Sequence, residues 1–172
     1  MTESTPSYQE HRAEAPGIVG CAVLTVSDTR TVDTDTSGGL IRELLTSNGH
    51  DIRDYVIIPD EPDQIRAKVD NWSSNPAIEC ILSNGGTGIA RRDTTYDVIS
   101  SMLEKRLDGF GEIFRQLSFQ EIGAAAMLSR AVAGIYRGTL IMAMPGSTNA
   151  VQLAMERLIG PELGHLIYEL NK

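Results

Sequence analysis

The residues most suited to chemistry lie in the segment ILSNGGTGIARRDTT, residues 81–95. Gly85, Gly86 and Gly88 follow an apolar run and precede two arginines and Asp93. Because glycine has no Cβ atom, such a loop can bring backbone N–H groups close to an anion, so the segment predicts phosphate or carboxylate binding. The pattern is neither G-x-G-x-x-G nor a P-loop, which needs a Lys-Ser/Thr pair after the last glycine. A tight strand-to-helix turn without a ligand is the alternative.

Asp60 and Asp93 are the carboxylates most suited to metal-assisted phosphate chemistry. Each follows the end of a predicted strand. Two Asp side chains on neighbouring loops could share a Mg²⁺ ion that bridges nucleotide phosphates. Both also precede a predicted helix, so an ordinary N-cap is the alternative for each. Arg91 and Arg92 could clamp phosphates, or they could be solvated loop charges.

Two further segments carry polar residues near predicted helix starts. In GFGEIFRQLS, residues 109–118, Glu112 and Arg115 share one helix face, where a surface ion pair is the simpler interpretation. In MPGST, residues 144–148, Ser147 could cap a helix or donate its hydroxyl to a ligand. No Ser-His-Asp arrangement is suggested by the positions of the histidines, which are His11, His50 and His165.

The elements that must position these residues alternate along the chain. Continuous apolar runs predict strands at residues 17–28, 51–59 and 78–83, and a strand pair or one long turned strand at 133–145. The spacing of apolar residues predicts helices at residues 37–50, 60–72, 95–105, 111–122, 147–159 and 161–171. This alternation predicts an α/β fold with three layers, α/β/α, around a mostly parallel central sheet.

The predicted sheet should bring the polar segments together. In open parallel sheets, ligands bind at the carboxyl ends of the strands, near the point where the strand order reverses. The residues expected at those ends are Ser27-Asp28, Pro59-Asp60, the loop from Asn84 to Gly88, and Pro145-Gly146-Ser147. We therefore expect one site along a single edge of the sheet.

Length and composition limit the class of protein. With 172 residues, 41% of them hydrophobic, the chain suits a single domain at residues 17–172 after a flexible N-terminal tail at residues 1–16. The net charge of -8 argues against a nucleic-acid partner. No apolar run approaches the roughly 20 residues that cross a bilayer, so no membrane partner is expected. Cys21 and Cys80 lie in predicted strands, which favours unpaired buried thiols and a cytoplasmic location.

Several short motifs occur in an order that is more specific than any one of them. They are TVSD (25–28), DTSG (35–38), IPDE (58–61), GGTG (85–88), RRD (91–93), GFGE (109–112), LSRAVAG (128–134) and MPGS (144–147). Across residues 17–167 the chain resembles the MoaB/MogA family of molybdenum-cofactor biosynthesis proteins, which is related to the gephyrin G domain. The DTSG and PGST details look closer to the MoaB branch.

This resemblance implies a MoaB/MogA-like fold and a Mg-ATP-dependent adenylylation of molybdopterin that releases pyrophosphate. Asp60 and Asp93 are then the catalytic residues, acting through Mg²⁺. The resemblance implies nucleotide phosphate binding by Gly85, Gly86, Thr87, Gly88 and Arg92. It implies pterin binding by Ser27, Asp28, Glu112, Ser118, Pro145, Gly146 and Ser147.

The resemblance also leaves alternatives open. Asn84 and Tyr96 stand where many members have Thr and Pro, and a non-catalytic molybdopterin-binding or scaffold protein of the same fold is the alternative function. A flavin- or nicotinamide-binding module is disfavoured by the glycine spacing. The family implies a homotrimer or homohexamer, with other enzymes of the pathway as candidate partners. The apolar segment at residues 121–135 suits a subunit contact, or it is plain core.

Overall fold

The computed structural model describes residues 17–172, and the tail expected at residues 1–16 lies outside them. Its strands are β1 (Gly20–Val26), β2 (Asp51–Ile58), β3 (Cys80–Asn84), β4 (Lys105–Arg106), β5 (Val132–Tyr136) and β6 (Thr139–Met144). They form one sheet in the order β2-β1-β3-β6-β5-β4. β1, β2, β3 and β6 are parallel, while β5 is antiparallel to β6 and to β4. The sheet is therefore mostly parallel, as predicted.

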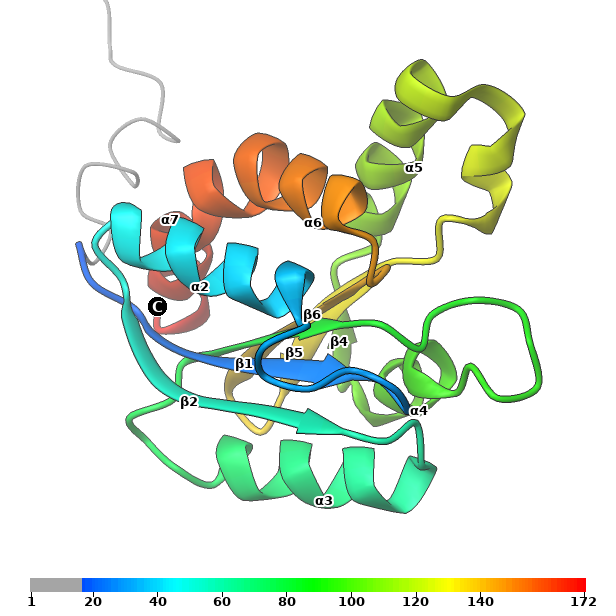
Figure 1. The fold of residues 1–172 in the computed structure, drawn as a ribbon. Coiled ribbons are helices and arrows are strands. Elements are labelled where there is room, and N and C mark those ends of the chain that lie inside the picture. The colour runs from blue at the N-terminus through cyan, green and yellow to red at the C-terminus, as the bar shows by residue number, and fades with distance from the viewer. Residues whose placement is uncertain (1–16) are drawn as a thin grey trace, which may run out of the picture.

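Helices cover both faces of this sheet. They are α2 (Thr36–Ser47), α3 (Pro62–Ser73), α4 (Thr95–Met102), α5 (Asp108–Ile122), the 3₁₀ helix η1 (Gly123–Leu128), α6 (Thr148–Ala154), the π turn η2 (Met155–Ile159) and α7 (Gly160–Leu170). α2, α5, α6 and α7 pack on one face, and α3 and α4 pack on the other (Figure 1). The predicted three-layer α/β/α architecture is confirmed.

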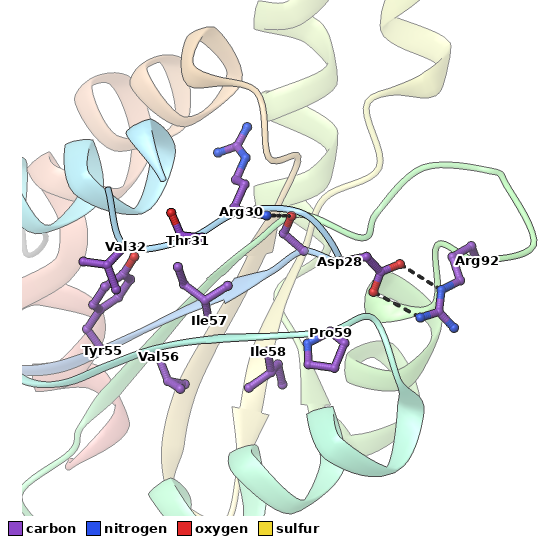
Figure 2. A pocket seen from close by; sticks show the side chains of 11 residues that line it. Asp28, Arg30, Thr31, Val32, Tyr55, Val56, Ile57, Ile58, Pro59 and Arg92 are labelled. Atoms are coloured by element: carbon purple, nitrogen blue, oxygen red, sulfur yellow. Dashed lines mark hydrogen bonds and ion pairs between the residues drawn. The ribbon is translucent and has the colours of Figure 1, made fainter. Parts of the chain in front are cut away.

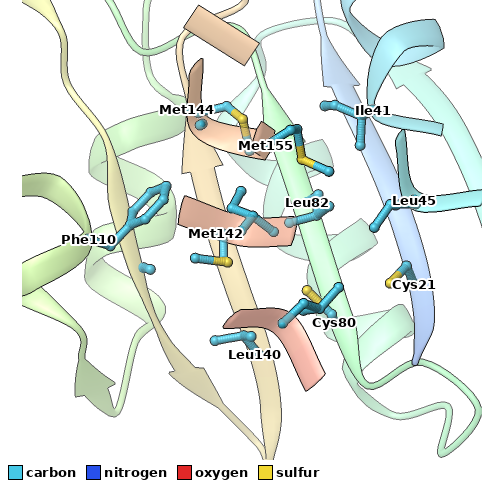
Figure 3. Close-up of a cluster of buried hydrophobic side chains, with 14 of the residues drawn as sticks. Cys21, Ile41, Leu45, Cys80, Leu82, Phe110, Leu140, Met142, Met144 and Met155 are labelled. Atoms are coloured by element: carbon cyan, nitrogen blue, oxygen red, sulfur yellow. The ribbon is translucent and has the colours of Figure 1, made fainter. Parts of the chain in front are cut away.

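Two hydrophobic cores lie on opposite faces of the sheet because side chains alternate along each strand. In β1, Cys21 and Val23 point into the core beneath α2, whereas Ala22 and Leu24 point into the core above α3. All 7 residues of β1 are buried, which explains its continuous apolar sequence. Figure 3 shows the first core, in which Cys21 and Cys80 are buried and unpaired, as predicted.

The segment at residues 95–105 differs from its predicted helix. The helix ends at Met102, and Leu103 has an extended backbone. The N–H of Glu104 then donates to the carbonyl of Ile135 in β5 over 2.8 Å, so Lys105–Arg106 adds a short strand at the edge of the sheet. A tertiary hydrogen bond thus overrides local helix propensity, which is a weak determinant at a helix end.

The last two predicted helices form one continuous helical run. The π turn Met155–Ile159 joins α6 to α7. Pro161 follows this turn and has no N–H to donate, and a wider turn is a common way to accommodate such a residue within a helix. Met155 and Ile159 are buried, so the run keeps one face on the sheet. No helix among the residues described is long and apolar enough to cross a membrane.

The predicted alternatives at residues 133–145 are resolved as a strand pair. β5 and β6 form an antiparallel hairpin in which Tyr136 pairs with Thr139. Arg137 and Gly138 both have positive φ, 49° and 76°. Positive φ at both central residues is the mark of a two-residue hairpin turn that matches strand twist.

Candidate functional site

The carboxyl ends of β1, β3 and β6 meet around a cavity of about 460 Å³, which we call the glycine-loop pocket. It lies between β1 and β3, where the strand order reverses. The N–H of Gly85 donates to the Met144 carbonyl over 3.2 Å, which joins the ends of β3 and β6. The residues singled out from the sequence that line this pocket are Ser27, Gly85, Gly86, Thr87, Gly88, Asp93, Pro145, Gly146 and Ser147.

The glycine loop is shaped around the two aspartates. Gly86 has φ +62°, and a Cβ atom there would lie 2.2 Å from Oδ2 of Asp60. A Cβ atom on Gly88 would lie 2.5 Å from Oδ2 of Asp93. Both positions therefore exclude a side chain. Within residues 17–172, the backbone N–H groups of Gly86, Thr87 and Gly88 donate to no protein acceptor, and free N–H groups in such a loop are an anion-binding arrangement.

Asp60 is not a helix cap, although its position before α3 allowed that interpretation. The N-cap of α3 is Glu61, which makes no side-chain cap bond. Asp60 instead accepts from Thr94, from the hydroxyl at 2.6 Å and from the N–H at 3.1 Å. Asp60 is buried, with only 5% of the residue exposed. Burial raises the pKa of Asp60; the Thr94 hydrogen bonds oppose this, and the charges of Asp93 and Asp28 add to it.

Asp93 is likewise not the cap of α4, since Thr94 occupies that position. Its Oδ2 accepts from the N–H of Ala90 at 3.0 Å, which closes the turn before α4. Asp93 lines the glycine-loop pocket, whereas Asp60 lies behind Gly86. Within the described part of the chain, no cluster of three or more His, Cys, Asp or Glu side chains could hold a metal ion.

Carboxylates beside the glycine loop could hold Mg²⁺ only jointly with other ligands. Mg²⁺ in nucleotide sites is held by one or two carboxylates, with substrate phosphates and water filling its other positions. Asp93 lines the glycine-loop pocket and meets that requirement with one carboxylate, and Asp60 abuts the loop from behind Gly86. The donor set therefore suits a cation that is bound jointly with a phosphorylated ligand.

A second and larger cavity of about 870 Å³, which we call the β2 pocket, adjoins the first. Figure 2 shows Tyr55, Ile57 and Pro59 of β2 and its end along this pocket, with Arg92 at one side. Ser27 and Arg30 line both cavities. The two pockets therefore share a wall, and a ligand or a pair of ligands that spans them must pass these two residues.

Arg92 is turned towards carboxylates and not towards the glycine loop. It makes two hydrogen bonds to Asp28, from Nε at 2.9 Å and from Nη2 at 3.1 Å, and a third from Nη1 to Glu61 at 2.7 Å. The Arg92 guanidinium lowers the pKa of the Asp28 carboxyl. Asp28 also accepts from the N–H of Asp60 at 3.1 Å, which ties the ends of β1 and β2 together.

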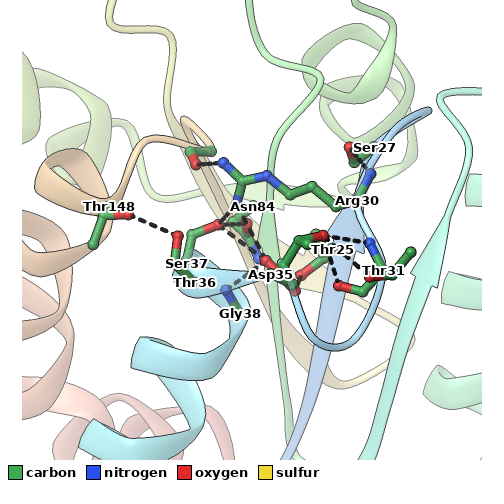
Figure 4. A network of polar contacts seen from close by, with 12 residues as sticks. Thr25, Ser27, Arg30, Thr31, Asp35, Thr36, Ser37, Gly38, Asn84 and Thr148 are labelled. Atoms are coloured by element: carbon green, nitrogen blue, oxygen red, sulfur yellow. Dashed lines mark hydrogen bonds and ion pairs between the residues drawn. The ribbon is translucent and has the colours of Figure 1, made fainter.

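Arg30 and Asp35 form the centre of a buried polar network (Figure 4). Neither was a candidate site residue in the sequence. Asp35 is 4% exposed and caps α2 by accepting from the N–H of Gly38 at 3.0 Å. Thr25 and Tyr55 donate their hydroxyls to its Oδ2 at 2.6 Å and 2.7 Å. Burial alone would raise the pKa of Asp35, but these bonds and the one from Arg30 together lower it.

Arg30 extends this network to the far side of the glycine-loop pocket. Its Nη1 donates to Asp35 over 3.2 Å and contacts the hydroxyl of Ser37, and its Nη2 donates to the carbonyl of Gly146 over 3.1 Å. An Asp just ahead of a predicted helix is a recognisable N-cap signal, so the role of Asp35 could have been found from the DTSG motif. No local signal links Arg30 to Gly146, which lies 116 positions away.

The two departures from the family pattern have defined contacts. The side chain of Asn84 accepts from Ser37 at 3.0 Å and donates to Thr25 over 2.9 Å, so it belongs to the Asp35 network. The Tyr96 ring lies 4.0 Å from the guanidinium of Arg130. Arg130 also donates to the carbonyl of Gly88 over 3.0 Å and therefore braces the glycine loop.

Glu112 and Ser118 lie apart from both pockets. Both are on α5, where Ser118 is buried and Glu112 lines a separate cavity of about 100 Å³ with Arg115. Their assignment to a pterin site stays a prediction. Ser147 accepts from the N–H of Ala150 at 3.3 Å and so caps α6 while it lines the glycine-loop pocket.

Comparison with known proteins places this architecture in one family. The chain matches the family described as "Probable molybdopterin binding domain" over residues 22–165. It is 56% identical over 167 residues to molybdenum cofactor biosynthesis protein B of Halalkalibacterium halodurans, covering 96% of this chain and 98% of that protein.

Two solved structures agree with this match. One is a crystal structure of molybdenum cofactor biosynthesis protein B, with a TM-score of 0.88 and 46% identity over 91% of this chain and 98% of that chain. The other is the tungsten cofactor synthesizing protein MoaB from Pyrococcus furiosus, with a TM-score of 0.83 and 35% identity over 92% of this chain and 100% of that chain. The chain therefore belongs to the family of probable molybdopterin-binding domains and, within it, to the MoaB branch of the MoaB/MogA proteins.

Proposed function

We propose that this protein acts in molybdenum-cofactor biosynthesis as a molybdopterin adenylyltransferase that uses ATP and Mg²⁺. The observation that carries the proposal is the glycine loop, whose N–H groups at Gly86, Thr87 and Gly88 have no protein acceptor within residues 17–172 and lie beside Asp93. Family membership supports molybdopterin as a ligand. Two adjoining cavities support a site for two anionic substrates.

The proposed reaction joins two phosphates. An oxygen of the terminal phosphate of molybdopterin attacks the α-phosphorus of ATP in line with the bond to the bridging oxygen. That bond breaks, and pyrophosphate leaves with the electron pair. The attacking oxygen is already anionic, so no general base is required. The work of the protein is to hold the two phosphates in line and to offset their charge with N–H groups and cations.

Asp60 and Asp93 would hold Mg²⁺ together with the phosphate oxygens of the substrate. When bound, the ion supplies positive charge against the transferred phosphate and the departing pyrophosphate. The raised pKa of the buried Asp60 supports this assignment, because a nearby cation stabilises the ionised form of a carboxylate that burial disfavours. Gly86 and Gly88 let the backbone approach both carboxylates closely.

Turnover tests the proposal directly. The protein is incubated with molybdopterin and Mg-ATP, and adenylyl-molybdopterin and pyrophosphate are quantified. We expect turnover by the parent protein and a loss of at least about 10²-fold in Asp60→Asn and in Asp93→Asn, as for the removal of a charge-stabilising group. Full activity in both variants would contradict the assigned roles while leaving the reaction in place.

A non-catalytic molybdopterin-binding protein is the second candidate function. It is favoured by one observation, that Asp60 lies against Gly86 and lines neither the glycine-loop pocket nor the β2 pocket. Binding of molybdopterin by the folded parent protein without any release of pyrophosphate would establish this candidate and exclude the first.

We also propose that the protein assembles as a homotrimer or homohexamer and works in the cytoplasm. Figure 1 shows α5 and the segment after it projecting from the body of the fold. Large apolar side chains are exposed along this arm, which is a feature of interaction surfaces. They are Ile113, Phe119, Ile122, Met127 and Leu128. Light scattering would measure the assembly, and a monomer at micromolar concentration would contradict it.

A further inference from the structure

The glycine-loop pocket has one cationic side chain in its wall. Among its lining residues, Arg30 is the only Lys, Arg or His, and Asp93 is the only Asp or Glu. Of the two arginines that follow the loop in sequence, Arg92 lines the β2 pocket and not this one, and Arg91 lines neither. The positive charge that faces the free N–H groups of the loop therefore comes from a segment far from the loop in sequence.

The surroundings of the two arginines differ in charge. Arg92 contacts two carboxylates, Asp28 and Glu61, so its immediate environment is net negative before any ligand arrives. Arg30 contacts one carboxylate, Asp35, which is ionised near neutral pH because its hydrogen bonds lower its pKa. A phosphate that approaches Arg30 meets a neutral pair with free N–H donors, whereas a phosphate that approaches Arg92 meets an excess of negative charge.

Arg30 is also held in position for binding. Nη1 is fixed by Asp35 and Nη2 by the carbonyl of Gly146 at 3.1 Å, so the fork bridges from the start of α2 to the turn after β6. Its Nε–H has no acceptor within residues 17–172, and its side chain is 30% exposed to solvent. A pre-ordered guanidinium loses little entropy when it binds a phosphate, and its planar fork suits two oxygens at once.

We propose that Arg30, anchored by Asp35, is the cationic residue that binds a phosphate group of the ligand at the junction of the glycine-loop pocket and the β2 pocket. Arg92 serves instead to tie Asp28 to Glu61. This inference rests on the proposed function only for the expectation that the ligand carries a phosphate or pyrophosphate group. Ser27 and Arg30 line both cavities, so the bound group lies where two substrates would meet.

Binding of inorganic pyrophosphate, measured by isothermal titration calorimetry, tests the assignment without any turnover. We expect Arg30→Met to weaken binding by about tenfold to a hundredfold, which corresponds to the loss of a charge-assisted hydrogen bond. Arg30→Lys should recover part of the affinity, because the charge remains while the fork is lost. Arg92→Met should change the affinity by less than about threefold, because the two carboxylates that Arg92 contacts already offset its charge.

Two controls separate binding from folding. Arg66→Met removes an arginine on α3 that donates to the hydroxyl of Ser101 over 2.9 Å and lines neither pocket, and it should bind pyrophosphate as the parent does. The slope of log affinity against log salt should become shallower in Arg30→Met and stay unchanged in Arg30→Lys, because it reports the number of charges engaged. If Arg30→Met does not fold, as judged by circular dichroism, Arg30→Lys carries the test, and parental affinity in that variant overturns the inference.

The outcomes distinguish this inference from the proposed reaction. Parental affinity in a folded Arg30→Met overturns the inference, and adenylylation by the parent protein would stand regardless. Arg30-dependent binding of pyrophosphate with no turnover supports the inference and excludes the reaction. A folded parent protein that binds no pyrophosphate overturns the inference outright.

Discussion

Asp35 and Asp60 are two buried aspartates in neighbouring regions of one sheet edge, and they differ in how their charge is balanced. They are almost equally buried, at 4% and 5% exposure. Asp35 receives hydrogen bonds from several residues, among them Thr25, Tyr55 and Arg30, whereas within residues 17–172 the carboxylate of Asp60 accepts from Thr94 alone. The pKa of Asp35 is lowered and that of Asp60 is raised.

This difference in pKa distinguishes a structural carboxylate from one whose negative charge is not balanced within the fold. At Asp35, hydrogen bonds and a cation outweigh burial, so the ionised carboxylate is satisfied within the fold. At Asp60, burial outweighs the bonds, and Asp93 and Asp28 add further negative charge. A group whose charged form is disfavoured by its own surroundings is a candidate functional residue.

The largest expected effect is the loss of stability in Asp35→Ala. This change leaves the hydroxyls of Thr25 and Tyr55, the N–H of Gly38 and the guanidinium of Arg30 without their acceptor. We expect the free energy of unfolding to fall by about 3 kcal/mol, combining a lost helix cap with buried donors left unpaired. Urea unfolding at neutral pH measures it. Asp60→Asn is the matched control and should lose less than about 1 kcal/mol; equal losses would erase the comparison.

A pair of threonine variants sharpens the comparison at intermediate size. Thr25→Val removes a hydroxyl that donates to Asp35 at 2.6 Å and accepts from Asn84 at 2.9 Å. Thr94→Val removes a hydroxyl that donates to Asp60 at 2.6 Å, while the Thr94 N–H remains. We expect the unfolding free energy to fall by about 2 kcal/mol in Thr25→Val and by about 1 kcal/mol in Thr94→Val, because Thr25→Val also removes the shorter of the two hydrogen bonds that the Asn84 amide donates. A larger loss in Thr94→Val would argue against the assigned roles.

The smallest expected effect is in the pH dependence of stability, where the two aspartates have opposite signs. The folded pKa of Asp35 lies below its ordinary value of 3.8, so its contribution is present above pH 3.8 and is lost as the pH falls through the folded pKa. The folded pKa of Asp60 lies above 3.8, so its contribution is present below pH 3.8 and is lost as the pH rises through the folded pKa.

Unfolding free energies of Asp60→Asn and the parent, measured from pH 3 to pH 7, test these signs. The variant should gain stability relative to the parent as the pH rises above 3.8, because only the parent must ionise a buried carboxylate. A difference that is flat with pH would show that Asp60 has an ordinary pKa. Carbon-13 NMR titration of the Asp60 carboxyl gives the same quantity independently.

Much of the fold could be predicted from the sequence because its signals are local. The apolar runs at β1 and β3 and the glycine after Asn48 mark strands and a helix end without reference to the rest of the chain. The 3₁₀ helix η1 and the strand β4 were not predicted. β4 has two exposed charged residues, and it exists only because β5 supplies its hydrogen bonds.

The candidate site could be predicted only in part. The glycine loop and the turn at Pro145-Gly146-Ser147 carry their own sequence signals, and parallel strands bring their ends to one edge. Capping and metal binding remained equal alternatives for Asp60 and Asp93, because an Asp just ahead of a helix can serve either role. The contact with Thr94, on another loop, is what excludes capping for Asp60.

The sequence by itself therefore determined the alternation of elements, the edge of the sheet at which the polar segments meet and the close approach of backbone that the glycine loop allows. Each of these depends on side-chain periodicity or on the absence of a Cβ atom, which are properties of short segments. Only the tertiary structure decided which arginine faces the glycine-loop pocket, since Arg30 reaches it by contacts with Asp35 and with Gly146. Charge balance between residues distant in sequence depends on distances in space, and these exist only in the folded chain.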